Sequence, residues 1–306
     1  MNLGEWPLIV FTILGQMSVG SFLVLIVIHF YAQRKAGMEQ ADRMSDIAFL
    51  AIGPVLILGL IGSIFHLNSP ANAWAAIGNI DTSWLSREIL FGLLFGIVGG
   101  VFAILQWRKI ATPTVRWVLA IIAALLGIGL VYSMTALYML EIQPAWNSAA
   151  TPILFATTTL LLGSMAVGAA LVANYNYLQR TDPDCAEVQC EILRGAMRGI
   201  AILAVLALGV ELVVLPLYLG YLSSLGGAGA ESASMYFGDY AVVFALRLVL
   251  VFLGAGVLGL FLYRNAVSPG RERFLAGFAY AAFAAVLIAE VMGRFLFYAT
   301  HVRIGI

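Results

Sequence analysis

Residues 117–140 read WVLAIIAALLGIGLVYSMTALYML, a stretch without a single charged side chain. It is long enough to span a bilayer, because a helix needs roughly 20 mostly apolar residues to cross the hydrocarbon core. The rest of the 306-residue chain is similar: 62% of its residues are hydrophobic, 10% are charged, and the mean hydropathy is +0.98. A soluble domain is roughly 45–50% apolar and about 25% charged. The chain is therefore predicted to be an integral membrane protein.

Seven further stretches are comparably long and apolar. We expect transmembrane helices at approximately 8–31, 47–67, 88–107, 117–140, 151–177, 199–222, 240–263 and 274–299. A β-barrel is not expected, because these runs lack period-two alternation and are about twice the length of barrel strands. The N-terminus has no basic segment typical of a cleavable signal, so the first apolar run is expected to remain as a span. We predict an all-α integral membrane protein with eight transmembrane helices, arranged as two four-helix bundles in a single domain over residues 1–306.

Lysine and arginine are distributed unevenly between the two sides of the predicted bundle. Twelve of the sixteen lie in the loops that follow the odd-numbered spans: Arg34, Lys35, Arg43, Arg108, Lys109, Arg116, Arg180, Arg194, Arg198, Arg264, Arg271 and Arg273. Loops rich in these residues stay in the cytoplasm. Both termini are therefore predicted to be non-cytoplasmic.

The overall charge and the cysteines exclude several classes of protein. Sixteen basic and sixteen acidic residues cancel, so a nucleic-acid partner is not expected. Cys185 and Cys190 are too few for a disulfide framework, and two thiols alone make a poor site for zinc or an iron–sulfur cluster. We expect no metal in this chain.

Glycine patterns in two predicted spans indicate helix packing. Gly92, Gly96 and Gly100 form a ridge of small residues, which is expected to let a neighbouring helix backbone approach closely. Residues 254–259 match the dinucleotide-binding pattern GxGxxG, but they lie in mid-span without the strand that such a site requires. We therefore interpret them as a packing surface.

Ionisable residues inside a membrane are costly and are functional candidates by default. On the cytoplasmic side we expect charge only in the loops. The candidates lie toward the other side: His66, Arg87, Glu88, Glu290, Arg294 and His301, with Glu211 and Arg247 somewhat deeper.

His66 ends the second predicted span, one helical turn after Ser63. A neutral imidazole at this position could accept a hydrogen bond from a quinol hydroxyl and take its proton. An interfacial histidine wetted at a helix end explains the residue equally well.

The last predicted span carries Glu290 and Arg294 four residues apart, with Tyr298 one turn further on the same face. Residues at this spacing can pair within a helix. We favour a charge pair that neutralises itself against a neighbouring helix. The alternative is that these side chains line a polar site near His66.

Two more charge pairs have both a structural and a functional interpretation. Arg87 and Glu88 either anchor the start of a helix or shape a site for a ligand headgroup. Glu211 and Arg247 are expected to form an interhelical pair, because each needs a partner in lipid. For the second pair we favour a structural role.

Haem is not expected in this chain. A transmembrane b-type haem needs axial ligands, usually histidines, that face each other within a bundle. The three histidines do not meet this need, because His29 lies a membrane thickness from His66 and His301, and His301 is in a tail beyond the last span.

Several blocks of sequence resemble the membrane anchor subunit of dimethyl sulfoxide reductase (the DmsC family). The chain also resembles the related anchor subunits of polysulfide reductases. The blocks are Glu5-Trp6-Pro7-Leu8, His66-Leu67-x-Ser69-Pro70, Leu85-Ser86-x-Glu88-Ile89, Pro144-x-Trp146, Thr151-Pro152 and Glu290-x-x-Gly293-Arg294-x-x-Phe297-Tyr298.

The resemblance implies a non-catalytic anchor, without a cofactor of its own, in a bacterial inner membrane. Such an anchor holds a molybdopterin-containing catalytic subunit and an iron–sulfur subunit, and oxidises menaquinol for anaerobic respiration. The family's quinol-site histidine corresponds to His66, and an acidic residue of that site corresponds to Glu88. The remaining quinol-binding candidates are Ser63, Arg87, Glu290, Arg294 and Tyr298.

Without haem, electrons cannot cross the bilayer through this chain, so quinol must be oxidised close to the iron–sulfur partner. Because His66 lies on the non-cytoplasmic side, we expect the partner subunits to dock there. The loops at 71–83 and 223–240 are aromatic and nearly uncharged, which fits a protein-covered surface. Two other interpretations stay open: a secondary transporter with Glu211 and Arg247 as a midplane site, and a purely structural anchor.

Overall fold

The computed structural model describes residues 5–65, 78–181, 186–267 and 272–304. Within these ranges the chain is helical and contains no β-strand. The helices are α1 (Trp6–Ala36), α2 (Met38–Ile64), α4 (Trp84–Arg108), α5 (Pro113–Tyr138), α6 (Ala150–Thr181), α7 (Ala186–Leu225), α8 (Gly227–Phe237), α9 (Ala241–Val251), the π-helix η4 (Phe252–Leu258), α10 (Gly259–Val267) and α11 (Glu272–Ala299). Eight of the helical segments described are long and apolar enough to cross a membrane, with α9, η4 and α10 forming one of them. The predicted all-helical class and the number of spans are confirmed.

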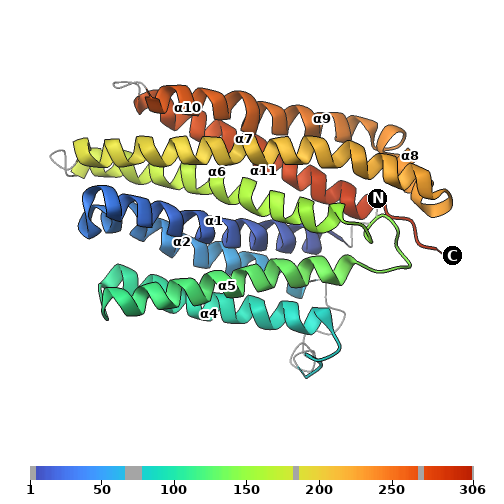
Figure 1. Ribbon diagram of the computed structural model, residues 1–306, viewed down its shortest axis with the longest axis horizontal. Coiled ribbons are helices and arrows are strands. Elements are labelled where there is room, and N and C mark those ends of the chain that lie inside the picture. Colours follow the sequence, from blue (N-terminus) through green and yellow to red (C-terminus); the bar gives the residue numbers. More distant parts are fainter. Residues whose placement is uncertain (1–4, 66–77, 182–185, 268–271, 305–306) are drawn as a thin grey trace.

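The long helices lie side by side along one axis (Figure 1). Both termini lie at the same end of the bundle, which we call the terminus end. The turns that join α1 to α2 and α4 to α5 lie at the opposite end, which we call the loop end. Each long helix packs against the next helix in the sequence. In addition, α1 packs against α6, and this contact joins the first four long helices to the last four. The grouping into two bundles remains a prediction.

The contact between α1 and α6 brings two backbones together. A Cβ atom on Gly20 would lie 1.8 Å from the carbonyl oxygen of Thr159, and one on Gly163 would lie 2.1 Å from the carbonyl carbon of Gly20. Only glycine fits at either position, as in other close helix contacts in membranes. As a result α1 is central: 78% of its most apolar segment is buried, against 28% for α2 and for α4.

The predicted glycine ridge on α4 does not play this part. Around Gly92 and Gly96, a Cβ atom would meet only the side chains of Leu130, Leu60 and Leu56, at 3.3–3.7 Å. Around Gly100 the space within 4 Å is open. The expected backbone approach is therefore wrong for this ridge, because α4 faces a looser contact than α1 does.

The seventh span changes from α-helix to π-helix over Phe252–Leu258 and then returns to α-helix. The π-helix contains all of the GxGxxG pattern except its last glycine, Gly259, which begins α10. A Cβ atom on Gly254 would lie 2.8 Å from a methyl carbon of Val286 and 3.1 Å from the carbonyl oxygen of Ala282, both on α11. The glycine therefore lets the seventh and eighth spans approach, which agrees with a packing role.

At the loop end the helices continue beyond the apolar runs. Only Gly37, with φ of 87°, separates α1 from α2, so most of the loop expected between the first two spans is helical. Glu39, Gln40 and Met44 are good helix formers, and hydropathy detects the apolar part of a helix rather than its ends. At the other end α2 stops at Ile64, earlier than the predicted residue 67.

Candidate functional site

The structure determines the setting of most sequence-predicted site residues, but His66 lies outside the described residues. Ser63 is in the last turn of α2, and its hydroxyl donates a hydrogen bond to the carbonyl oxygen of Leu60 at 2.7 Å. Arg87 turns toward the loop before α4: its guanidinium donates to the carbonyl oxygens of Ile80 and Asp81, each at 2.8 Å, and stacks on the ring of Trp84. These contacts support the interpretation of Arg87 as an anchor for the start of α4.

Glu88 lies just beyond the first turn of α4, and its side chain is buried in the bundle. The residue is only 4% exposed, and its Oε2 atom has no hydrogen-bond partner among the residues described. Glu88 interacts electrostatically with Tyr138, the last residue of α5, and with Tyr298 near the end of α11. The two tyrosine hydroxyls form a hydrogen bond of 2.5 Å. We call Glu88, Tyr138 and Tyr298 the Glu88 cluster.

An aromatic layer lies beside the Glu88 cluster at the terminus end. The indole of Trp146 stacks on the rings of Phe297 and His301, with ring centroids 5.3 Å and 4.4 Å apart, and meets Tyr138 edge to face. Its Nε1 donates to the carbonyl oxygen of Phe297 at 2.8 Å. The tail after α11 is held to the same region by a backbone hydrogen bond from Ile304 to Ile142. This layer packs against Tyr138 and Tyr298 of the Glu88 cluster.

A second buried cluster joins three helices in the other half of the molecule. Arg247 on α9 donates to Glu211 on α7, and a Cβ atom on Gly293 of α11 would lie only 2.3 Å from the Nε atom of Arg247. Glu290, also on α11, accepts a hydrogen bond from the hydroxyl of Thr158 at 2.6 Å. Glu211, Arg247 and Glu290 are 2%, 6% and 2% exposed. We call these three residues the Arg247 cluster.

Arg294 lies between the two clusters. It donates to the side-chain oxygen of Gln16 on α1 at 2.6 Å, and its guanidinium lies 3.8 Å from the ring centroid of Phe155. Within the described chain no ion pair joins Arg294 to Glu290, although their spacing allows one. The neighbouring helices offer both side chains other partners, so the two residues connect α11 to α1 and α6 instead of to each other.

A cavity opens beside the Arg247 cluster. It is lined by residues of α6, α7, α8, α9 and α11, including Thr158, Tyr218, Tyr236, Arg247, Glu290 and Arg294. Its volume is about 40 Å³. Four buried polar atoms of the surrounding charged residues have no hydrogen-bond partner in the described chain: Glu211 Oε2, Arg247 Nε, Glu290 Oε1 and Arg294 Nε. Buried polar groups are normally satisfied, so this concentration marks a site for water or a ligand.

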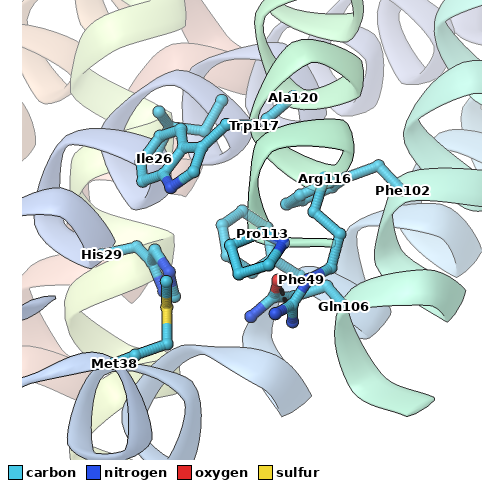
Figure 2. A pocket seen from close by; sticks show the side chains of 10 residues that line it. All are labelled: Ile26, His29, Met38, Phe49, Phe102, Gln106, Pro113, Arg116, Trp117 and Ala120. Atoms are coloured by element: carbon cyan, nitrogen blue, oxygen red, sulfur yellow. Dashed lines mark hydrogen bonds between the residues drawn. The ribbon is translucent and has the colours of Figure 1, made fainter. Parts of the chain in front are cut away.

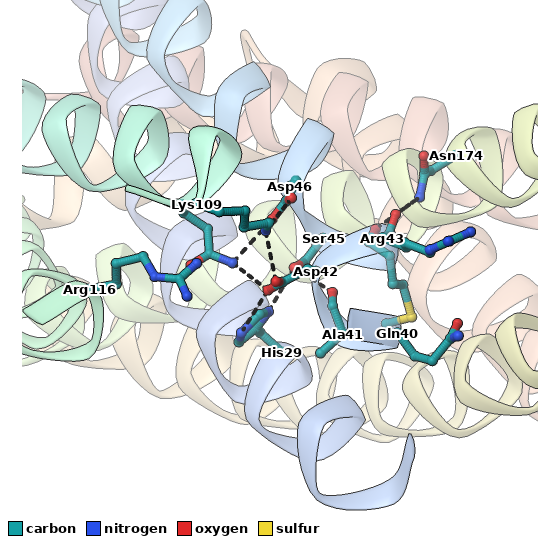
Figure 3. A network of polar contacts seen from close by, with 12 residues as sticks. His29, Gln40, Ala41, Asp42, Arg43, Ser45, Asp46, Lys109, Arg116 and Asn174 are labelled. Carbon is teal, nitrogen blue, oxygen red and sulfur yellow. Dashed lines mark hydrogen bonds and ion pairs between the residues drawn. The ribbon is translucent and has the colours of Figure 1, made fainter. Parts of the chain in front are cut away.

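A third cluster lies at the loop end, where we expected charge only in loops. Lys109 forms ion pairs with Asp42 at 2.8 Å and with Asp46 at 2.6 Å (Figure 3). Both aspartates are on the helical extension of α2, and Asp42 is 7% exposed. The expectation is therefore wrong, because these acids lie on the helix where it continues past the apolar run, and Lys109 pairs with both of them there. We call these three residues the Lys109 cluster.

His29 and Arg116 complete this end of the bundle. The hydroxyl of Ser45 donates to the carbonyl oxygen of Ala41, so His29 Nδ1 must donate to that hydroxyl, at 2.8 Å. Arg116 donates to Gln106, whose amide in turn donates to Asp42 and Asp46. His29, Gln106 and Arg116 line a cavity of about 10 Å³ together with aromatic side chains (Figure 2). That volume holds about one water molecule.

Sequence reasoning missed two parts of this arrangement. Tyr138 lies in an unbroken apolar run, and only its contact with Tyr298 on a distant helix marks it as a site residue. Asp42 and Asp46 were placed in a loop, although their spacing of four residues is that of one helix face. In the part of the chain that the structure describes, no group of three or more His, Cys, Asp or Glu side chains is arranged to hold a metal ion.

Eight apolar helices with buried charged clusters define a multi-pass membrane protein. Comparison with known proteins identifies its family. Residues 1–300 match the family described as DMSO reductase anchor subunit (DmsC). The sequence is 30% identical to the YnfH subunit of anaerobic dimethyl sulfoxide reductase from Escherichia coli, over 98% of this protein and 96% of that one. The C subunits of anaerobic dimethyl sulfoxide reductase from Escherichia coli and from Haemophilus influenzae are each 28% identical, over 98% and 100% of this protein and 96% and 98% of those subunits. The protein belongs to the family of dimethyl sulfoxide reductase anchor subunits.

Proposed function

We propose that this chain binds menaquinol at the terminus end of the bundle, oxidises it, and passes the electrons to an iron–sulfur subunit of a molybdopterin-containing reductase in anaerobic respiration. The chain acts as the quinol-oxidising anchor and carries no haem. Its partners, an iron–sulfur subunit and a molybdopterin-containing catalytic subunit, dock on the terminus end. This end is the non-cytoplasmic face of a bacterial inner membrane, since the basic loops lie at the other end.

The observation that carries this proposal is the buried carboxyl group of Glu88. It has an oxygen without a hydrogen-bond partner among the described residues, and it interacts electrostatically with Tyr138 and Tyr298, whose hydroxyls bond each other. A quinol presents hydroxyl groups that need acceptors and lose protons on oxidation. A buried acid with a free acceptor atom meets both needs.

His66 is the second part of the proposed site and accepts one of the quinol protons. It follows α2 in the sequence, and the last turn of α2 carries Ser63, while Glu88 lies just beyond the first turn of α4. Arg87 fixes the start of α4, and Arg294 supplies positive charge near the tyrosines. Glu290, by contrast, belongs to the Arg247 cluster, so its part in quinol binding is indirect.

The test replaces Glu88 with glutamine, which is similar in size but cannot take up a proton. In Glu88→Gln we expect the quinol-dependent rate of the assembled, reconstituted complex to fall by about 10²-fold or more, as is typical when a general base is lost. Reduction of the same acceptor with a soluble one-electron dye as donor should keep its full rate, because the dye delivers electrons directly to the partner subunits. His66→Ala should behave like Glu88→Gln.

Ser148→Ala is a suitable control, because Ser148 also lies near the terminus end and its buried hydroxyl has no partner in the described chain. Its quinol-dependent rate should match that of the unmodified complex. Full quinol-dependent activity in both Glu88→Gln and His66→Ala would contradict the proposal and favour a purely structural anchor. Ion-coupled uptake of a solute by the isolated chain would instead indicate a secondary transporter.

A further inference from the structure

An apolar groove with a volume of about 380 Å³ runs between α1, α6 and α7 in the loop-end half of the bundle. One wall extends from Leu23 to Tyr31 on α1 and the other from Gly195 to Leu203 on α7, each along one helix face. Apart from the hydroxyl of Tyr31, the side chains that line the groove are apolar. The volume lies within the roughly 300–1,000 Å³ that is typical of ligand sites.

The groove is open on the side that faces lipid. Gly199 in the α7 wall is exposed, and a Cβ atom there would meet no atom within 4 Å. Val27 in the α1 wall is 68% exposed. Water in a cavity needs polar partners, and these walls offer almost none. An apolar chain is therefore the occupant that fits the walls.

The length of the groove matches one leaflet of a bilayer. From Leu23 to Tyr31, and from Gly195 to Leu203, each wall advances by eight residues, which is roughly 12 Å of helix. One half of the hydrocarbon core is roughly 15 Å thick. A single acyl chain that enters from the loop end therefore fits along the groove and ends near the middle of the membrane.

An ion pair lies at the loop-end mouth of the groove. Lys35 Nζ lies 2.8 Å from Glu191 Oε1, and this contact joins α1 to α7. Lys35 follows Tyr31 by one turn, and its Nζ atom lies 6.0 Å from the centroid of the tyrosine ring. Glu191 precedes Gly195 by one turn, and a Cβ atom on Gly195 would overlap the hydroxyl of Tyr31. The phenol therefore reaches from α1 to α7 beside the ion pair.

The ion pair can bind further charged groups. The side chains of Lys35 and Glu191 are 37% and 66% exposed. An ammonium has three donors and a carboxylate has two acceptor oxygens, so one contact between them leaves capacity on both. Arg194 and Arg198 are directed elsewhere, since both donate to the carbonyl oxygen of Ala266 on α10. The groove thus ends at a cation and an anion that lie side by side.

We propose that this groove binds one zwitterionic phospholipid with a primary ammonium, of the phosphatidylethanolamine type. One acyl chain lies along the groove, the phosphate accepts hydrogen bonds from Lys35, and the ammonium of the headgroup donates to Glu191. An anionic glycerol headgroup brings no cation to Glu191, and a choline headgroup has no N–H to donate. The site lies in the loop-end half, apart from the proposed quinol site, and does not depend on quinol oxidation.

Native mass spectrometry of the full chain tests the choice of headgroup. The chain, purified in detergent and stripped of lipid, is mixed with equal amounts of phosphatidylethanolamine, phosphatidylcholine and phosphatidylglycerol that carry the same acyl chains. We expect a one-to-one adduct in which phosphatidylethanolamine exceeds each of the other two by about threefold to fivefold, the range of contacts between partly exposed charges.

Two glycines of α7 provide a matched pair of variants. Gly199 and Gly209 are both exposed, and a Cβ atom on either would meet nothing within 4 Å, so a larger side chain fits at both positions. Gly199 lines the groove, whereas Gly209 does not. Gly199→Leu should fill the groove and lower the one-to-one adduct at least tenfold, while Gly209→Leu should retain it. An adduct that is unchanged in Gly199→Leu overturns the groove as the binding site.

Variants of the ion pair test the role of each charge. Glu191→Gln removes the anion and should abolish the preference for phosphatidylethanolamine, because phosphatidylglycerol then binds at least as well. Lys35→Gln should weaken the adducts of all three lipids, since each carries a phosphate. Equal retention of the three lipids by the unmodified chain, or a preference for phosphatidylglycerol, overturns the proposed headgroup.

Discussion

The Lys109 cluster at the loop end and the Arg247 cluster toward the terminus end both combine two acids with a base, but they differ in how far they are satisfied. Lys109 pairs with both Asp42 and Asp46, and its side chain is 41% exposed. In the Arg247 cluster the side chains of Arg247 and Glu211 are 7% and 2% exposed. Moreover, an Oε atom of each glutamate and the Nε atom of the arginine have no partner in the described chain.

This difference separates a structural network from a functional candidate. At the loop end Lys109 reaches water while it pairs with both aspartates, and Gln106 donates further hydrogen bonds to them. Near the terminus end the same types of charge are kept away from water and left partly unsatisfied, which is costly and is retained mainly at functional sites. Buried ionisable residues are thus better judged by their unmet hydrogen bonds than by their number.

The largest effect is expected from Arg247→Leu. Removing one partner of a buried ion pair leaves uncompensated charge and costs about 3–5 kcal/mol. Equilibrium unfolding of the chain in detergent micelles, followed by tryptophan fluorescence, measures this loss. Leu246→Ala is the control, because Leu246 is 50% exposed on the same helix and should change stability little.

A triple variant identifies the cause of that loss. Arg247→Leu combined with Glu211→Gln and Glu290→Gln leaves no buried charge in the Arg247 cluster and should recover most of the stability. If the triple variant is as unstable as Arg247→Leu alone, the loss comes from packing against Gly293 rather than from charge. The contrast with the Lys109 cluster would then no longer hold.

A smaller effect is expected at Lys109. Lys109→Ala removes two ion pairs of a partly exposed side chain and should cost about 1 kcal/mol. Lys109 has φ of 56°, so Lys109→Gly loses the same ion pairs but relieves the left-handed backbone, a gain of about 1 kcal/mol relative to alanine. The same unfolding experiment should therefore rank glycine above alanine. A loss of several kcal/mol in both variants would show that this cluster is as critical as the Arg247 cluster.

The smallest effect is expected from salt. Raising NaCl to about 1 M shortens the screening length to about 3 Å and should lower the stability of the unmodified chain by a few tenths of a kcal/mol through the Lys109 cluster. Lys109→Ala should remove most of this dependence, whereas the triple variant at Arg247 should keep it. If the salt dependence disappears in the triple variant instead, the screened charges belong to the Arg247 cluster, which contradicts the comparison.

The number of spans could be predicted from the sequence, because the requirement for an apolar stretch of bilayer length is one-dimensional. The contacts could not. Gly92, Gly96 and Gly100 have the spacing of a packing ridge, yet the backbones touch at Gly20 and Gly163, because a glycine shows only that a helix permits approach and not which helix approaches.

The candidate site divides in the same way. Glu88, Glu290, Arg294 and Tyr298 could be selected from the sequence, because ionisable or polar groups stand out in apolar runs. Their partners could not. Spacing favoured a bond between Glu290 and Arg294, whereas the folded chain offers Thr158 and Gln16. Tyr138 became a candidate only through its contact with Tyr298.

The sequence by itself determined that this protein is an eight-span membrane protein of the dimethyl sulfoxide reductase anchor family, with basic loops on one side and buried charge toward the other. These properties depend on composition and order along the chain. Only the tertiary structure decided that Arg247 pairs with Glu211 against Gly293, and that the hydroxyls of Tyr138 and Tyr298 bond each other. Such contacts depend on how helices far apart in sequence rotate and approach, and that is set by packing of the whole bundle.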